Sequence, residues 1–342
     1  MTQFPLGIVL VMAGGAFQGT MLWPMKLTKK WAWENTWLVF SVAAYLVAPW
    51  VLAVLTVPHL FDVLRRVGSH DLIMTCLYGI AWGVGNVLFG LGVRFLGMGL
   101  GYTITMGLTV SVGTLVPLLV LAPSDAFSRR GIVLYSGVLA VLLGIVLCSH
   151  AGSLREAKVR NVALAREQSA GISFARGLAI CLAAGILVPG GNIAISFGLR
   201  IAAAARAVGA SNFTASNVLL AVLQFPLFLC SVCYCLFLLS ENRTFAKFRV
   251  TGTGHYWLVS ALMGLLQMMG ISLYGAGTLM LGRLGTSIGY SILMSSMIIT
   301  ATGLGVFSGE WRDSGRTPAM VMAGGLLILS TAIFVIGYGA KP

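Results

Sequence analysis

Charged residues are scarce in this sequence: Asp, Glu, Lys and Arg make up 9% of its 342 residues, while hydrophobic residues make up 58%. An ordinary soluble domain carries about 25% charged residues. So few charges cannot cover a surface that faces water, whereas segments that face lipid require this composition. The composition therefore excludes an ordinary soluble protein and indicates a chain that lies mostly within a bilayer.

Acidic residues are the scarcer sign of charge: 9 Asp and Glu stand against 22 Lys and Arg, which gives a net charge of +13. In a soluble protein this excess would suggest a nucleic-acid partner, but basic and aromatic residues are not interleaved as in nucleic-acid binding proteins. The basic residues fall between apolar runs, as Lys26, Lys29, Lys30, Arg65 and Arg66 do. We interpret them as topology anchors, and we expect the lipid bilayer, and no nucleic acid, as a partner.

Clusters of potential metal ligands are missing as well. The six cysteines all lie inside apolar runs: Cys76, Cys148, Cys181, Cys230, Cys233 and Cys235. The group Cys230–Cys235 resembles a metal or redox motif, but its run holds no His or carboxylate, and free Cys packs as a small apolar residue. We therefore expect no metal and no other cofactor. An enzyme would need clustered His, Asp or Glu near the membrane interface, so we predict that the chain is not an enzyme.

Long apolar runs are what the sequence has in abundance. Ten runs carry no charged residue: 5–25, 37–58, 72–93, 95–122, 131–149, 177–199, 207–240, 256–282, 284–309 and 317–340. The shortest has 19 residues, and a helix needs about 20 to cross the hydrocarbon. The sequence therefore predicts an all-α membrane protein with ten transmembrane helices.

The chain also repeats itself. The pattern Leu-Gly, Gly-Tyr-x-Ile-x-Met in Leu96–Met106 returns in Leu284–Met294, at an offset of 188 residues. Because five spans make an odd number, two copies of such a unit must cross the membrane in opposite directions. That is the inverted-repeat architecture of secondary transporters, which place the substrate near the membrane midplane between the halves.

This repeat predicts how the chain divides. Residues 1–149 would form the first five-helix repeat, residues 150–176 a basic polar linker, and residues 177–342 the second repeat. Lys and Arg residues are more frequent in the odd-numbered loops between the predicted spans, with 14 of the 22. By the positive-inside rule the odd loops should be cytoplasmic, with both termini outside.

Four local patterns resemble a known family. They are Lys29-Lys30-Trp31-x-Trp33-Glu34-x-x-Trp37, Pro49-Trp50, Trp82-Gly83-x-Gly85-Asn86 with Arg94-x-Leu96-Gly97-Met98, and Glu310-Trp311-x-x-x-Gly315-Arg316-x-Pro318. Together they resemble the L-rhamnose/proton symporter family of the drug/metabolite transporter superfamily, over nearly the whole chain. The resemblance implies a ten-helix carrier with a 5+5 inverted repeat, located in a bacterial inner membrane, that imports a deoxysugar with protons by alternating access.

A neutral sugar needs hydrogen bonds and aromatic surfaces but no charge, and the predicted spans supply both. The candidate substrate-binding residues are Gln18, Trp23, Trp82, Asn86, Tyr102, Asn192, Gln267, Tyr274 and Tyr290. Pro189-Gly190-Gly191-Asn192 could interrupt the sixth span, as discontinuous helices do at transporter sites. The alternatives stay open: each amide could join two helices, and Trp23 could belong to an interfacial aromatic belt.

Proton coupling needs an ionisable group, and all nine acidic residues lie outside the apolar runs. The candidates nearest the spans are Glu34, Asp71 and Glu310, of which Glu34 is the preferred coupling acid. Glu34 could instead be a surface charge beside Lys30, and Glu310 could form a salt bridge with a nearby arginine.

Other functions remain open at this stage. The same fold could serve an exporter or a facilitator of other small metabolites or drugs, although a cation exporter would favour a carboxylate deep in a span. A non-transporting membrane sensor or a lipid-modifying enzyme is the more remote alternative. The sugar and the oligomeric state are not predicted by these patterns.

Overall fold

The computed structural model describes residues 3–159, 174–309, 311–312 and 315–339, and the secondary structure of these residues is helical, without strands. The membrane-length helices, in chain order, are α1 (Gln3–Thr20) continued by η1 (Trp23–Leu27), α2 (Trp33–Ser41) continued by η2 (Val42–Val47) and α3 (Ala48–Thr56), α5 (Ser69–Leu121), α7 (Arg129–Val159), α9 (Phe174–Leu187) continued by α10 (Gly190–Phe197) and α11 (Leu199–Ala207), α12 (Ser216–Glu241), α13 (Gly254–Met280), α14 (Gly285–Phe307) and α15 (Arg316–Gly339). The connections hold the short helices α4 (Leu60–Arg66), α6 (Pro123–Ala126), η3 (Phe245–Arg249) and η4 (Gly282–Leu284).

Ten segments of the described residues are long and apolar enough to cross a membrane, which confirms the predicted number of spans. The helix α5 provides two of them, because Gly97 interrupts it with a φ of 81° and a ψ of 167°. Helices are the expected outcome for such runs, since lipid offers no partner for a backbone N–H or C=O and a helix pairs them internally.

Three helices differ in extent from the apolar runs that predicted them. The seventh span begins at Ser216 and not at residue 207, and α11 extends the sixth span through Arg200 and Arg206 to Ala207. The turn between them contains no charge, but Gly209 has a φ of 99° that ends the helix. The fifth helix, α7, continues to Val159, so the first ten residues of the predicted linker are helical, while residues 160–173 lie outside the described residues.

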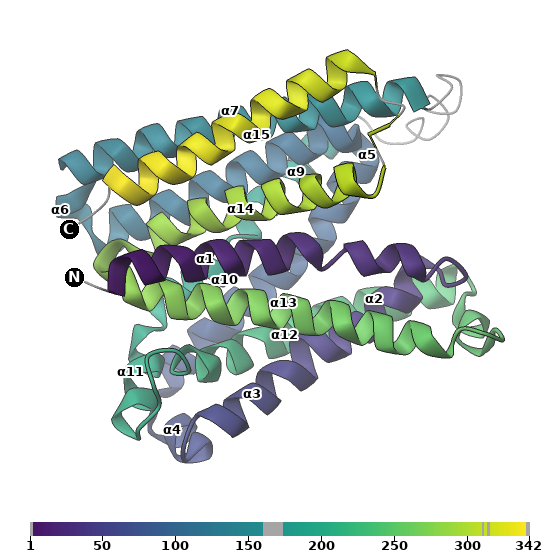
Figure 1. Cartoon of the computed structure of the whole chain (residues 1–342). Helices are drawn as coiled ribbons and strands as arrows, with labels where there is room; N and C mark the ends of the chain where they lie inside the picture. Colours follow the sequence, from purple (N-terminus) through teal and green to yellow (C-terminus); the bar gives the residue numbers. More distant parts are fainter. Residues whose placement is uncertain (1–2, 160–173, 310, 313–314, 340–342) are drawn as a thin grey trace.

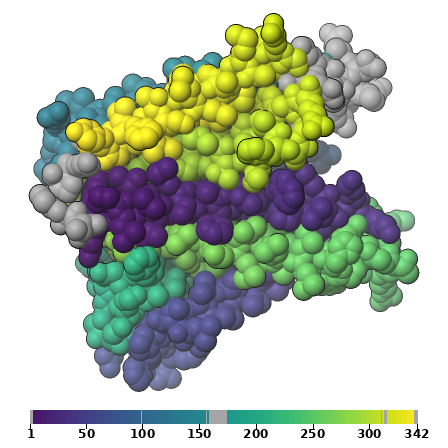
Figure 2. All heavy atoms as spheres, in the orientation of Figure 1, coloured from purple at the N-terminus to yellow at the C-terminus, as the bar shows by residue number. Residues whose placement is uncertain are grey.

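The helices lie side by side in a few pairs of close neighbours (Figure 1). α1 packs on both α13 and α14, α9 packs on α5, and α7 packs on α15. In the space-filling view α1 (purple) crosses the middle of the molecule, with α13 on one side of it and α14 and α15 on the other (Figure 2). α1 is therefore a central element that contacts two helices of the second half of the chain.

Glycines explain how closely α1 approaches its neighbours. A Cβ at Gly14 would lie 2.6 Å from the carbonyl oxygen of Gly270 on α13, and a Cβ at Gly15 would lie 2.6 Å from that of Leu293 on α14. Neither position has room for a side chain, so the three helices meet backbone to backbone, as small residues allow in membranes. This close packing of α1 also fixes the position of Gln18, which lies one turn further along the same helix.

Cysteines fill similar contacts. A Cβ at Gly92 would lie 2.6 Å from the sulfur of Cys181, and one at Gly325 would lie 2.7 Å from that of Cys148. These two thiols therefore pack against glycines of neighbouring helices, which agrees with the interpretation of cysteine as a small apolar residue.

Candidate functional site

A cavity of about 600 Å³ lies between α1, η1, α2, α5, α10, α13 and α14. All nine candidate substrate-binding residues line it: Gln18 on α1, Trp23 on η1, Trp82, Asn86 and Tyr102 on α5, Asn192 on α10, Gln267 and Tyr274 on α13, and Tyr290 on α14. Residues up to 272 positions apart in the sequence therefore share one space. Its volume is in the range of roughly 300–1,000 Å³ that is typical of small-molecule sites. The structure thus brings the candidates together, while their roles in binding stay a prediction.

The cavity has its mouth at one end of the helices. Trp23, Lys26 and Trp33 line it there, where η1 ends and α2 begins, together with Leu304 and Gly305 near the end of α14. Trp23 and Trp33 are 41% and 39% exposed. This end carries the odd-numbered loops, which the charge count predicts to be cytoplasmic.

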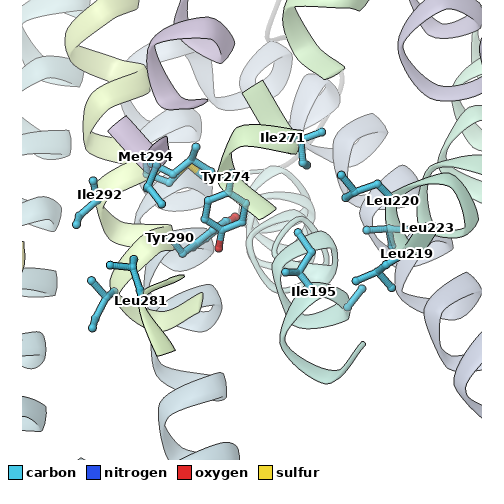
Figure 3. Close-up of a cluster of buried hydrophobic side chains, with 14 of the residues drawn as sticks. Ile195, Leu219, Leu220, Leu223, Ile271, Tyr274, Leu281, Tyr290, Ile292 and Met294 are labelled. Carbon is cyan, nitrogen blue, oxygen red and sulfur yellow. The ribbon is translucent and has the colours of Figure 1, made fainter. Parts of the chain in front are cut away.

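At its inner end the cavity is bounded by Asn192, Tyr274 and Tyr290. The Asn192 side-chain nitrogen donates to the carbonyl oxygen of Gly113 at 2.6 Å, and the Tyr274 hydroxyl donates to Asn192 Oδ1. The rings of Tyr274 and Tyr290 lie beside each other, with centroids 6.4 Å apart (Figure 3). Asn192 therefore joins α10 to α5 and α13 in this conformation, as the helix-joining alternative predicts.

The position of Asn192 follows from a break in its span. α9 ends at Leu187 and α10 begins at Gly190, so the helix is interrupted at Val188 and Pro189. This confirms the interruption that the Pro-Gly-Gly-Asn sequence predicted. Gly191 packs against the ring of Trp82, since a Cβ there would lie 2.7 Å from it. The break thus gives α10 its own direction and places Asn192 against the cavity.

Several polar groups of the cavity have no partner within the described part of the chain. The buried Oε1 of Gln267 accepts no hydrogen bond there, and the buried hydroxyl of Thr109 neither donates nor accepts one. The side chains of Gln18 and Asn86 form none among the described residues either. A polar group at membrane depth that lacks a partner costs several kcal/mol. These groups therefore favour a ligand, or water, that offers hydroxyls.

Thr109 is a candidate that the sequence analysis missed. It follows Tyr102 and Thr105 at spacings of three and four residues, and all three line the cavity from α5. That spacing places residues on one face of a helix, so the signal was present in the sequence. It was overlooked because threonine is common in apolar helices.

The opposite wall of the cavity is apolar. It is formed mostly by α14, through Leu293, Met294, Met297 and Ile298. Among the described residues that line the cavity, Lys26 at the mouth is the one charged side chain. The cavity is thus suited to a neutral molecule with one hydroxyl-rich and one apolar face.

Glu34 is buried, with 5% exposure, so the alternative of a surface charge beside Lys30 was wrong. Its Oε1 accepts hydrogen bonds from Asn242 Nδ2 at 3.0 Å and from Thr244 Oγ1 at 2.7 Å. These contacts fasten the start of α2 to the end of α12. Glu34 does not line the cavity, but its neighbour Trp33 does.

The other two candidate acids differ from Glu34. Asp71 is partly exposed in the first turn of α5, with its Oδ1 3.7 Å from His70 Nδ1, and it does not line the cavity. Glu310 lies outside the described residues. Glu34 is therefore the one fully buried carboxylate among the described candidates.

The described residues form ten membrane-length helices around a cavity that holds amide and hydroxyl groups beside a broken helix, which is the architecture of a multi-pass membrane transport protein. The sequence model of the family described as L-rhamnose-proton symport protein (RhaT) matches residues 2–341. The chain therefore belongs to this family, whose members are transporters. Similar relatives include the L-rhamnose-proton symporters of Escherichia coli strain 55989 and of Escherichia coli O8 strain IAI1, each 26% identical over 344 residues, which cover 98% of this chain and 97% of the relative.

Proposed function

We propose that this protein imports a small neutral sugar of the rhamnose type together with protons, across a bacterial inner membrane. Its membership of the family supports this function, because the similar relatives are named L-rhamnose-proton symporters. The relatives are 26% identical to this chain, and the class of sugar follows from the groups that line the cavity.

The observation that carries the proposal is the set of unpartnered polar groups in the cavity. Gln267 Oε1 can accept a hydrogen bond from a sugar hydroxyl, and Thr109 can accept or donate one. Gln18 and Asn86 add two amides. No Asp or Glu lines the cavity within the described residues, so an organic cation or a metal would find no counter-charge there. A neutral polyhydroxylated solute satisfies these groups.

Glu34 is the proposed coupling acid. As a carboxylate it accepts charge-assisted hydrogen bonds from Asn242 and Thr244, and such bonds are about twice as strong as neutral ones. Protonation removes the charge and weakens the link between α2 and α12. Because Trp33 and Trp37 of α2 line the cavity, movement of α2 would change the shape of the sugar site.

We further propose that the fold is a 5+5 inverted repeat of the drug/metabolite transporter superfamily, with halves at 1–149 and 177–342. The packing of helices supports this, since α1 contacts α13 and α14. In the same way α9 contacts both spans of α5, through Cys181 against Gly92 and Gly185 against Leu108. The first span of each proposed half is also broken, after Thr20 and after Leu187. Alternating access would then consist of one half rocking against the other around the cavity.

The sidedness follows from the charge count. If the odd-numbered loops are cytoplasmic, the cavity mouth beside Lys26 faces the cytoplasm and the structure is inward-open. The sugar would reach it from outside after the end near Tyr274 and Tyr290 has opened.

Uptake into proteoliposomes tests the function. The purified protein should accumulate L-rhamnose when the outside is acidic, and a panel of other neutral sugars defines its range. Gln267→Leu should abolish uptake and leave a folded protein. Gln224→Leu is a matched control, because Gln224 is a buried amide that lies outside the cavity lining. Uptake that does not depend on the pH gradient would indicate a facilitator. If no sugar were transported, the proposal would be rejected in favour of another metabolite as substrate.

A further inference from the structure

A second cavity of about 310 Å³, here called the side chamber, lies between α2 with η2, the first span of α5, and α12. Trp33, Trp37, Tyr45 and Asn86 line both the side chamber and the central cavity. The two spaces therefore adjoin each other. The volume of the side chamber is at the lower end of the usual range for small-molecule sites.

One wall of the side chamber is a row of aromatic rings. Trp33 and Trp37 are stacked, with centroids 4.9 Å apart and an interplanar angle of 17°. Tyr234 of α12 meets Trp33 edge-on at 6.4 Å. The three rings contact one another in sequence and form an aromatic wall, and pyranose rings place their C–H faces on aromatic rings.

A change of helix type contributes to the same wall. Residues Val42–Val47 form a π-helix, a rare turn that is frequent at functional sites. Tyr45 lies within this turn, is 4% exposed and faces both cavities. The π-helix thus places the Tyr45 side chain between the two spaces.

Polar groups of the side chamber also lack protein partners. Among the described residues the Asn86 amide and the hydroxyls of Tyr45 and Tyr234 form no hydrogen bond, whereas Ser231 is paired with Ser41 at 2.7 Å. The side chamber thus combines three unpartnered polar groups with an aromatic wall. The central cavity has the same combination of groups in a larger space. A lipid acyl chain would leave all three polar groups without a hydrogen-bond partner, and water would not pack against the aromatic rings.

We propose that the side chamber is a second binding site for a monosaccharide of the transported class, with Asn86 shared between the two sites. This inference rests on the proposed sugar transport. The side chamber offers one amide where the central cavity offers four, so it binds sugar more weakly. Two sugars bind per protein, and Asn86 contacts a sugar in either position.

Equilibrium dialysis of radiolabelled L-rhamnose measures the stoichiometry, with the protein in nanodiscs of phosphatidylethanolamine and phosphatidylglycerol. The expected result is two sugars per protein, with distinct affinities. Val87→Phe fills the side chamber, because Val87 lines this chamber and not the central cavity. It should reduce the stoichiometry to one and retain the tighter site, which also shows that the variant is folded.

Tyr234→Leu should have the same effect by removing the edge of the aromatic wall. Phe237→Leu is the matched control, since Phe237 is 59% exposed on the same helix and should leave two sites. If the wild-type protein bound one sugar, the side-chamber site would be overturned and the transport function would stand. The same would follow if both chamber variants still bound two sugars. If the wild-type protein bound no sugar at all, the proposed function itself would fail.

Discussion

The two ends of the central cavity are built in different ways. At the closed end, neutral hydrogen bonds cross between helices, from Tyr274 to Asn192 and between Thr114 and Ser291, which are 2.8 Å apart. The ring of Tyr290 also lies directly against Gly113, where no side chain would fit. At the open end the lining consists of partly exposed tryptophans and Lys26, and the nearby link is the buried carboxylate Glu34.

This difference indicates that the closed end responds to sugar and the open end to protonation. The buried hydrogen bonds described at the closed end join neutral groups, so they are insensitive to pH, but a ligand that offers hydroxyls can compete for them. The open end has a group whose charge can change. Sugar binding would thus act on the closed end and protonation on the open end, and symport would require the two to be coupled.

Gly15→Val should have the largest effect, because it breaks the close backbone contact between α1 and α14 beside the cavity. A side chain there would collide with the Leu293 carbonyl and with Ser296 Cβ, which would lie 2.7 Å away. We expect little folded protein by size-exclusion chromatography and no measurable uptake. Gly303→Val is the control on α14, since a Cβ at Gly303 meets no atom within 4 Å. A normal elution profile for Gly15→Val would contradict the tight packing of α1.

Glu34→Gln tests the open end. Glutamine can still accept the hydrogen bonds from Asn242 and Thr244, but it cannot carry a proton. Gradient-driven accumulation of sugar should therefore be lost, while exchange of labelled for unlabelled sugar should continue. Glu241→Gln, at an exposed carboxylate of α12, serves as the control. Full accumulation by Glu34→Gln would reject Glu34 as the coupling acid and favour a facilitator.

Tyr274→Phe weakens the closed end without changing its shape. It leaves Asn192 Oδ1 without its donor, and an unsatisfied buried acceptor costs about 1–3 kcal/mol. The closed end should open about tenfold more often, since 1.4 kcal/mol corresponds to a factor of ten in an equilibrium. The rate at which a maleimide alkylates Ser291→Cys reports this opening, because Ser291 is fully buried there.

Tyr256→Phe is the matched control for that measurement, since Tyr256 is buried on the same helix but packs at the open end against Trp31. Its alkylation rate should equal that of the Ser291→Cys protein alone. Equal rates for Tyr274→Phe and Tyr256→Phe would mean that the bond to Asn192 does not hold the closed end.

The sequence predicted the spans well because lipid imposes a signal along the chain itself. A run of about 20 apolar residues must become a helix whatever surrounds it. The same rule missed the turn before Ser216, since a glycine with positive φ ends a helix without any charge. The division into two halves depends on a repeat that sequence alone suggests, and it stays a proposal.

The cavity could be predicted in part, for a related reason. An amide inside an apolar run is conspicuous, so Gln18, Asn86 and Gln267 were recognised. The burial of Glu34 was not predicted, because its partners Asn242 and Thr244 are 208 and 210 positions away and only the fold brings them together. Tyr45 was overlooked because its position in the cavity lining depends on a π-helix, which no pattern in the sequence predicts.

Arg283→Gln should have the smallest effect of these changes, although it also removes a link at the closed end. Arg283 on η4 lies 3.8 Å from Asp125 on α6 and donates to Ser124 Oγ at 3.3 Å. The arginine side chain is 61% exposed, and exposed ion pairs contribute roughly 0–1 kcal/mol. The alkylation rate of Ser291→Cys should rise by less than about fivefold, and less at high salt because the pair is screened. Arg200→Gln, at an exposed arginine of α11, gives the baseline. If Arg283→Gln opened the closed end as much as Tyr274→Phe does, the surface ion pair and not the buried hydrogen bonds would hold it, and the contrast between the two ends would have to be abandoned.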